Sequence, residues 1–305
     1  MRVTNNMMID NFLLNFSKNT ERMDKLQQML ASGKRIQYPS DDPIGTVTVM
    51  KLNRDVSAID QYKKNVDDAD SWLKLTDTAL NNVTTVLSRA RELLVEGSNS
   101  PTETEDIVSE INQLKQQLVN VGNTEYSDRY IFGGMKTTTE AYTLDTTNSA
   151  NGGVVYNGSN VAAGDSWELK YNVGADDQIT INVTGDKIFG DTGSGDNLFK
   201  LFDDIAADLQ AGNTTGISSH IDELDDHINN ILAVRADVGA RDNRVALTKN
   251  RLADDNLNFT NLLANAEDAD IAETIMDLVN SINVYTSSLN VGSRIIQPSL
   301  LDFLR

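Results

Sequence analysis

The stretch YKKNVDDADSWLKLTDTALNNVTTVLSRARELL, residues 62–94, decides the fold. Its apolar and small residues recur at alternating intervals of four and three, which is the repeat of a coiled-coil seam. Those positions are Tyr62, Val66, Ala69, Leu73, Thr76, Leu80, Val83, Leu87, Ala90 and Leu94. The start signal Ser40-Asp41-Asp42-Pro43 and Gly97 bound the pattern, so it predicts a helix over 44–96. Such a helix would be about 80 Å long, whereas a compact chain of this size is roughly 50 Å across. The sequence therefore predicts an elongated, mainly α-helical rod.

Both ends of the chain carry the same repeat. The N-terminal seam ends before Gly33, a residue favoured after helix ends, and the C-terminal seam runs on to Ile296. The two stripes can pair with each other as in an ordinary bundle, or be completed by neighbouring subunits. We favour assembly, because two helices alone leave much of each stripe exposed. The expected assembly interface consists of Ile9, Phe12, Phe16, Met23, Leu26, Leu30, Ile271, Ile275, Leu278, Ile282, Tyr285 and Leu289.

Further helices and a small β region are expected between these ends. A capping box at Thr102–Glu105 predicts a helix to Val121, and Leu198–Leu209 and the residues from Ile217 onward predict two more. The second of these has a half-polar packing face, in which Arg235, Asp242, Lys249 and Asn256 alternate with apolar residues. Strands are expected at 153–156, 167–173 and 178–184.

Composition excludes several classes of function. The 305 residues carry 26 basic and 45 acidic side chains, a formal charge of −19, which disfavours binding to nucleic acid or anionic membrane. The charge is uneven, with a net +3 over residues 1–65 and −22 over the rest, which is either simple solvation or head-to-tail complementarity in an assembly. The chain has no cysteine and only two histidines. We expect no cleaved signal, because Asp10 interrupts the apolar stretch near the N-terminus.

The sequence gives only weak indications of a catalytic or metal-binding site. His220, Glu223 and His227 fall at i, i+3 and i+7 and could face a metal, but they flank an apolar seam and are interpreted as a solvated flank. The Gly- and Asp-rich segment 186–196 lacks the oxygen-ligand spacing of an EF-hand and is interpreted as a loop rather than a calcium site. No cofactor, metal or enzymatic activity is expected. A metal-dependent enzyme with its site near His220 is the alternative from another class.

Two sequence motifs resemble the bacterial flagellin family. LASGKRI at 30–36 followed by SDDPIG at 40–45 resembles its N-terminal signature, and AEDADIAE at 266–273 resembles its C-terminal signature. The similarity covers about residues 1–130 and 235–305. Pro43 and Ile44 stand where filament flagellins usually have small residues, and the chain ends PSLLDFL rather than in a glutamine-rich stretch. Both departures resemble the hook–filament junction members of the family; filament flagellin itself is the alternative.

The resemblance implies a folded-back chain and a structural role. Residues 1–42 and 263–305 would form an inner core of paired terminal helices, 43–135 and 196–262 a helical rod, and 136–195 an outward-facing β insert. The insert is then expected to be replaceable by a short linker. The implied partners are other copies of the chain in a ring, hook-associated protein 1 on the hook side, flagellin on the filament side and a cytoplasmic export chaperone. Such proteins leave the cell through the flagellar type III export apparatus and act outside it.

Overall fold

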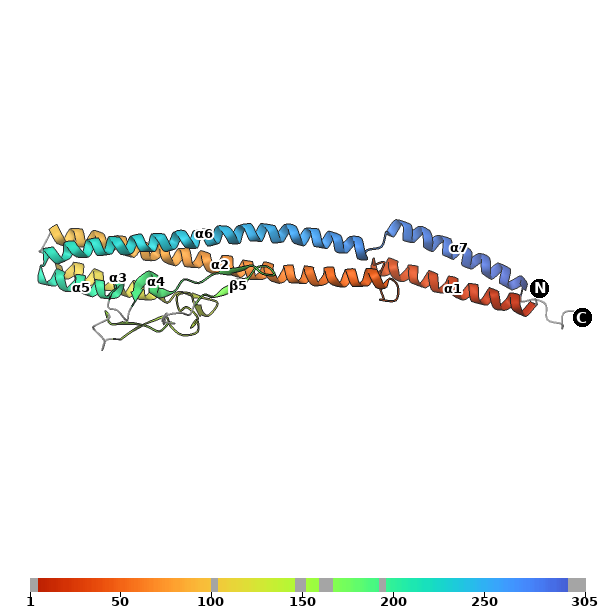
Figure 1. The fold of residues 1–305 in the computed structure, drawn as a ribbon, viewed down its shortest axis with the longest axis horizontal. Coiled ribbons are helices and arrows are strands. Elements are labelled where there is room, and N and C mark those ends of the chain that lie inside the picture. Colours follow the sequence, from red (N-terminus) through yellow and green to blue (C-terminus); the bar gives the residue numbers. More distant parts are fainter. Residues whose placement is uncertain (1–4, 100–103, 146–151, 159–166, 192–195, 296–305) are drawn as a thin grey trace, which may run out of the picture. The chain divides into compact units, whose positions relative to one another are not determined.

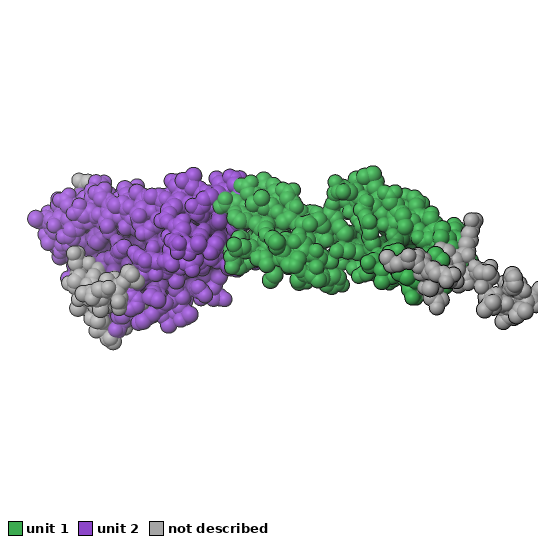
Figure 2. Space-filling view, turned by 45° about the vertical axis from the view of Figure 1, so that its right-hand side comes forward, with its two compact units in different colours: residues 1–58, 255–305 green, residues 59–254 purple. Residues whose placement is uncertain are grey.

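The computed structural model describes residues 5–99, 104–145, 152–158, 167–191 and 196–295. The chain divides into two compact units, residues 1–58 with 255–305 (unit 1) and residues 59–254 (unit 2), shown in green and purple in Figure 2. The expected cap at Thr102, the end of the C-terminal seam at Ile296 and the closing PSLLDFL stretch lie outside the described residues. No helix among the described residues is long and apolar enough to cross a membrane.

Unit 1 contains the terminal helices, α1 (Asn5–Ser32) and α7 (Ile271–Ile295), which pack against each other (Figure 1). Helix α1 ends as expected at Gly33, whose φ of +72° lies in the left-handed region where glycine costs least. The Gly33 N–H donates to the Met29 carbonyl at 2.8 Å. The mainly α class and the pairing of the terminal helices are therefore confirmed.

The long helix α2 (Pro43–Asn99) has 57 residues and begins in unit 1. Asp42 caps it, since its Oδ1 accepts the Gly45 N–H at 2.9 Å, and Pro43 occupies the first helical position, where no N–H is needed. A side chain at Gly45 would collide with Asp42, because an added Cβ would lie 2.3 Å from Oδ2. The start signal at 40–43 is confirmed, and the helix extends slightly beyond the expected range of 44–96.

In unit 2 the expected seam of α2 is buried from Val66 to Leu94. Thr76, its one polar member, is buried with its hydroxyl donating to the Trp72 carbonyl at 2.9 Å. Helix α6 (Thr214–Glu267) presents a seven-residue repeat of buried side chains. They are Ile217, Leu224, Ile231, Val238, Val245 and Leu252.

The half-polar face expected on α6 is confirmed by ion pairs with α2. Arg235 contacts Asp77, with Nε 2.6 Å from Oδ1, and Lys249 lies 2.8 Å from Asp67. A third pair joins Arg91 of α2 to α6. The residue numbers of these partners rise on one helix as they fall on the other, so α2 and α6 run antiparallel in this unit.

Helices α3 (Thr104–Gly122) and α5 (Leu198–Ala211) pack together in the same unit. The described strands form two-stranded antiparallel sheets. The pairs are β1 (Glu125–Tyr126) with β2 (Arg129–Tyr130), β3 (Tyr142–Leu144) with β4 (Val154–Tyr156), β5 (Lys170–Asn172) with β6 (Gln178–Thr180), and β7 (Gly190–Asp191) with β8 (Asp196–Asn197). The expected strands correspond to β4, β5 and β6, although the latter two are shorter than expected.

An aromatic cluster anchors the β segments to the helices. Tyr142 of β3 lies at the centre, with ring centroids 5.0 to 5.2 Å from those of Tyr156, Phe189 and Phe199. Phe189 ends the short helix α4 (Gly185–Phe189), and Phe132 packs edge-on to it. The expected loop at 186–196 is therefore wrong where described, because α4 and β7 with β8 occupy it.

The β5–β6 hairpin is held to α6 by arginines. Arg241 donates to the backbone carbonyls of Thr180 and Asn182 at 3.3 and 3.2 Å. Arg244 and Arg251 both contact the Asp177 carboxylate next to β6. Helical side chains therefore satisfy the edge of this small sheet, which two strands could not stabilise alone.

Candidate functional site

Polar contacts and one aromatic pair hold the terminal helices together. Asn19 Nδ2 donates to the Ser281 carbonyl at 3.2 Å, and the Phe16 and Tyr285 rings lie 5.0 Å apart. Near the other end of α7, Gly292 is buried against the Phe12 ring, and a Cβ added there would lie 2.4 Å from Phe12 Cζ. The two helices therefore approach closely at a residue without a side chain.

On α1 the expected seam is the covered face. Its seven positions are all buried or half-buried: Ile9, Phe12, Phe16, Asn19, Met23, Leu26 and Leu30. Leu13 and Leu14, which lie outside that spacing, are exposed. The structure thus brings all six α1 residues of the predicted interface onto the side that packs within the subunit.

On α7 the structure divides the predicted interface. Leu278 and Tyr285 lie on the covered face, whereas Ile271, Ile275, Ile282 and Leu289 are between 40% and 47% exposed. The face toward α1 instead has its own four–three spacing of mostly small residues. Its members are Thr274, Leu278, Ser281, Tyr285, Ser288 and Gly292.

This register has a physical reason. Small side chains permit close approach of two helices, and a buried Thr or Ser can satisfy its hydroxyl locally, as Thr274 does by donating to the Asp270 carbonyl at 2.6 Å. Sequence reasoning chose the most apolar positions and missed the seven-residue repeat Thr274, Ser281, Ser288. The signal was present, but this row of hydroxyl residues lies one residue, about 100°, around the helix from the row Ile275, Ile282 and Leu289 that hydrophobic periodicity selects.

The exposed residues form a continuous apolar stripe on α7. We define the α7 stripe as Ile271, Ile275, Val279, Ile282 and Leu289, which share one helix face by their spacing. Each is roughly half exposed, so covering it would contribute about 1 kcal/mol. On the other flank of the α1–α7 pair lies a hollow of about 460 Å³, lined in part by Phe12, Val284 and Val291.

The two sequence signatures meet in unit 1. The Arg35 N–H donates to the Glu267 carbonyl at 2.7 Å, and the Ala269 N–H donates to the Gly33 carbonyl at 2.9 Å. Lys34 adds an ion pair to Glu267 at 2.6 Å. Segments more than 230 residues apart in sequence therefore form one structure, which positions the starts of α2 and α7.

Asp41 organises the loop between α1 and α2. Its carboxylate lies 2.8 Å from Lys25 Nζ and accepts the Tyr38 and Gln37 N–H groups at 3.1 and 3.4 Å. The hydrogen bond from Lys25, followed by that from the Tyr38 backbone, lowers the pKa of Asp41 below its ordinary value.

The histidines do not form a metal site among the described residues, where no group of three or more His, Asp or Glu side chains could hold an ion. His220 is mostly buried, with Nε2 3.1 Å from Asp208 of α5 and Nδ1 3.2 Å from Glu223. The expected solvated flank is therefore wrong for His220, which ties the end of α5 to the start of α6.

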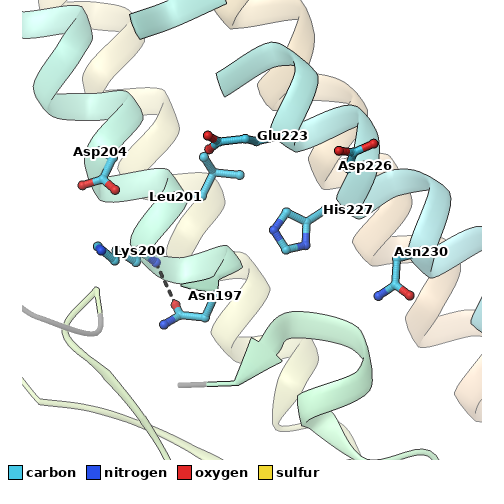
Figure 3. Close-up of a pocket in the computed structure, with 8 residues that line it drawn as sticks. All are labelled: Asn197, Lys200, Leu201, Asp204, Glu223, Asp226, His227 and Asn230. Atoms are coloured by element: carbon cyan, nitrogen blue, oxygen red, sulfur yellow. Dashed lines mark hydrogen bonds between the residues drawn. The ribbon is translucent and has the colours of Figure 1, made fainter. Parts of the chain in front are cut away.

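His227 projects from α6 toward a separate polar hollow of about 360 Å³ (Figure 3). The lining residues are Asn197, Lys200, Leu201, Asp204, Glu223, Asp226, His227 and Asn230. Asn197 caps α5, its Oδ1 accepting the Lys200 N–H at 2.9 Å. The hollow therefore combines acidic, basic and amide side chains.

Comparisons with known proteins agree with the resemblance of the signatures. Residues 3–137 match the bacterial flagellin N-terminal helical region, and residues 221–304 match the bacterial flagellin C-terminal helical region. Flagellar hook-associated protein 3 of Escherichia coli K12 is 27% identical, over 92% of each chain. Flagellin of Bacillus subtilis 168 is also 27% identical, over the whole of both chains.

Two solved structures share the fold. A putative flagellar hook-associated protein from Vibrio parahaemolyticus superposes with a TM-score of 0.65 at 22% identity, covering 75% of this chain and all of that one. Flagellar hook-associated protein-3 from Legionella pneumophila superposes with a TM-score of 0.62 at 18% identity, covering 71% of this chain and 98% of that one.

Proposed function

Because the chain belongs to the bacterial flagellin family, we propose that it is a structural subunit of the flagellum that joins the hook to the filament. The similarity to flagellar hook-associated protein 3 of Escherichia coli over nearly the full length of both chains supports the junction role. Pro43 and Ile44, which depart from filament flagellins, support it as well.

The observation that carries an assembly role is the α7 stripe. Within its own chain, α7 packs on α1 through Leu278, Tyr285 and a row of Thr, Ser and Gly, while its most apolar face is left about half exposed. A soluble monomer gains nothing from such an arrangement, whereas a subunit completed by its neighbours does. We therefore assign Ile271, Ile275, Ile282 and Leu289 to contacts between subunits, and the α1 seam, Leu278 and Tyr285 to the pair that presents them.

The proposed partners follow from the position of a junction. Copies of the chain form a ring, with hook-associated protein 1 on the hook side and flagellin on the filament side. A cytoplasmic chaperone accompanies the chain before type III export, and the protein acts outside the cell. We propose that the chain is divided into three parts. The inner part is 1–42 with 263–305, the middle part is 43–135 with 196–262, and the outer part is 136–195. The role is mechanical, without catalysis or a cofactor.

Filament flagellin is the second candidate, supported by the full-length similarity to the Bacillus subtilis protein. The two functions differ in what the purified protein does. A junction subunit binds isolated hooks that carry hook-associated protein 1 and stops after limited addition, and added flagellin then polymerises on it. Growth of long filaments from the purified protein alone, seen by electron microscopy, would instead identify a flagellin.

The α7 stripe is tested in the same hook-binding experiment. Ile275→Ser with Ile282→Ser should abolish hook binding while the helical signal of the soluble protein is retained, because about half of each side chain is already exposed to water in the subunit. Val284→Ser with Val291→Ser is the matched control, since both are exposed on the opposite flank of α7. If the stripe variant binds hooks normally, the assignment of the stripe is incorrect.

A further inference from the structure

The five most exposed large apolar side chains among the described residues lie on two helix faces. Ile44, Met50 and Val47 on α2 are 83%, 67% and 63% exposed, and Leu247 and Leu257 on α6 are 72% and 62% exposed. None belongs to the paired terminal helices. Soluble proteins rarely group their most exposed large apolar residues in this way without a partner.

The two faces share one spacing. On α2, Ile44, Val47, Lys51 and Arg54 fall at i, i+3, i+7 and i+10. On α6, Leu247, Asn250, Asp254 and Leu257 fall at the same intervals. Alternation of three and four keeps each set on one side of its helix, and both sets span about 15 Å. We call them the α2 outer face, which includes Met50, and the α6 outer face.

The charges of the two faces are opposite. The α2 outer face carries Lys51 and Arg54, of which Arg54 is paired with Asp55 at 3.4 Å. The α6 outer face carries Asp254, and Arg251, one turn before it, is paired with Asp177. Lys51 and Asp254 take part in no ion pair with any residue that the structure describes, although most other cations of α2 do. An apolar and basic face of matching length and repeat is therefore complementary to an apolar and acidic one.

We propose that the α2 outer face of one copy packs on the α6 outer face of a second copy of this chain. In this contact the two helices run antiparallel to each other. Ile44 then lies opposite Leu257, and Lys51 lies within one helical turn of Asp254. Because two different faces meet, the contact is heterologous and can repeat around a ring. The inference rests on the proposed assembly role and identifies a second contact, separate from the α7 stripe.

The absence of native cysteine permits a direct test by disulfide cross-linking. Full-length Met50→Cys and Asn250→Cys variants are mixed in equal amounts, concentrated, and oxidised both in solution and on isolated hooks. We expect a cross-linked dimer that needs both variants, since each chain has a single cysteine and no bond can form within one chain. Asn53→Cys replaces Met50→Cys as the control, because Asn53 is an exposed residue of α2 outside the α2 outer face.

Three outcomes separate the possibilities. A dimer from Met50→Cys with Asn250→Cys, and not from the control pair, supports the contact. A dimer from Met50→Cys alone would overturn it in favour of a two-fold contact between like faces, and no dimer in either setting would overturn it altogether. Hook binding is measured separately by sedimentation, so protein that binds hooks without this cross-link refutes the contact while leaving the junction role standing.

Charge reversal supplies a second test. Lys51→Glu should lower the yield of cross-linked dimer by up to about fivefold, the range expected for an exposed ion pair. Adding Asp254→Lys to the Asn250→Cys partner should restore the yield. If Lys51→Glu and Asp254→Lys each lower the yield of dimer and their combination does not restore it, the two side chains do not meet.

Discussion

Arg235 on α6 donates two hydrogen bonds to the Asp77 carboxylate on α2, from Nε to Oδ1 at 2.6 Å and from Nη2 to Oδ2 at 3.3 Å. Its third nitrogen donates to Asn81 at 2.9 Å. The guanidinium therefore spans two successive turns of α2. Arg235 occupies a position in the middle of the α2–α6 seam where a coiled coil usually has an apolar residue. The pairing of the long helices therefore depends on polar contacts as well as on Leu and Val.

Arg235→Leu should lower the free energy of unfolding by about 1 kcal/mol, because a partly exposed bidentate pair is lost while the aliphatic packing is kept. Chemical denaturation monitored by circular dichroism measures the effect. Arg54→Leu is the matched control, since the ion pair of Arg54 is with its neighbour Asp55 and both side chains are exposed. A double-mutant cycle with Asp77→Ala should give most of the loss as coupling; a coupling near zero would contradict the assigned contact.

Gly292→Val should weaken the α1–α7 pair. The added side chain collides with the Phe12 ring, whose centroid lies 6.0 Å from that of Phe16, so the ring must shift and the packing of the pair is disturbed. We expect proteases to release both terminal helices several-fold faster than in the parent chain, with the helical signal of unit 2 unchanged. Gly239→Val on α6 is the control, because an added Cβ there meets nothing within 4 Å. Unchanged proteolysis of the termini would mean that the close approach at Gly292 is not needed.

Asp41→Asn should destabilise the loop between α1 and α2 at neutral pH by about 1 kcal/mol, since the Lys25 pair is lost and two backbone N–H groups keep a weaker acceptor. Contacts with Lys25 and Tyr38 lower the pKa of Asp41 in the folded state. Its stabilising contribution is therefore complete above the pKa of Asp in the unfolded chain, about 4, and is lost as the pH falls through the folded pKa. Hydrogen exchange of the Tyr38 amide, followed from pH 7 to pH values below the folded pKa of Asp41, tests this. A difference between variant and parent that persists once the carboxylate is protonated would exclude its charge as the cause.

The sequence predicts helices better than it predicts which faces meet. Heptad spacing located α2 and α6 because their seams are apolar and long, and Gly33 and Asp42 mark helix ends by local chemistry. On α7, however, the covered face contains Thr274 and Ser281, and only the geometry of α1 makes those positions inward. The choice between two adjacent stripes on one helix is a tertiary property, which periodicity alone does not contain.

The short β elements are harder to predict from the sequence than the helices. The turn between β1 and β2 places Ser127 and Asp128 at φ of +49° and +60°, the conformation of a type I′ turn, without the glycine that usually reveals it. Tyr142 joins β3 to an aromatic cluster whose members come from four separate segments. Neither feature has a periodic signal, because the turn has only two residues and the cluster depends on long-range contacts.

Removal of the β insert tests where the core of unit 2 ends. A short linker in place of residues 136–195 was expected from the sequence to leave the rod folded, but the packing argues otherwise. The deletion removes Tyr142, Tyr156 and Phe189, and leaves Phe199 of α5 without its ring contacts. Losing one buried aromatic side chain typically costs 3–5 kcal/mol, so we expect α3 and α5 to unfold locally in the deletion variant.

A smaller deletion distinguishes the core from the surface of the insert. Replacing only the β5–β6 hairpin, residues 170–180, by a Gly-Ser linker keeps all of those rings. It removes the hairpin's contacts with Arg241, Arg244 and Arg251 and the buried side chains of Val173 and Ile179. This variant should melt at a lower temperature but keep the hydrogen-exchange protection of α5, which the full deletion loses. Equal protection of α5 in both variants would show that the aromatic cluster belongs to the insert alone and that α3 and α5 are stable without it.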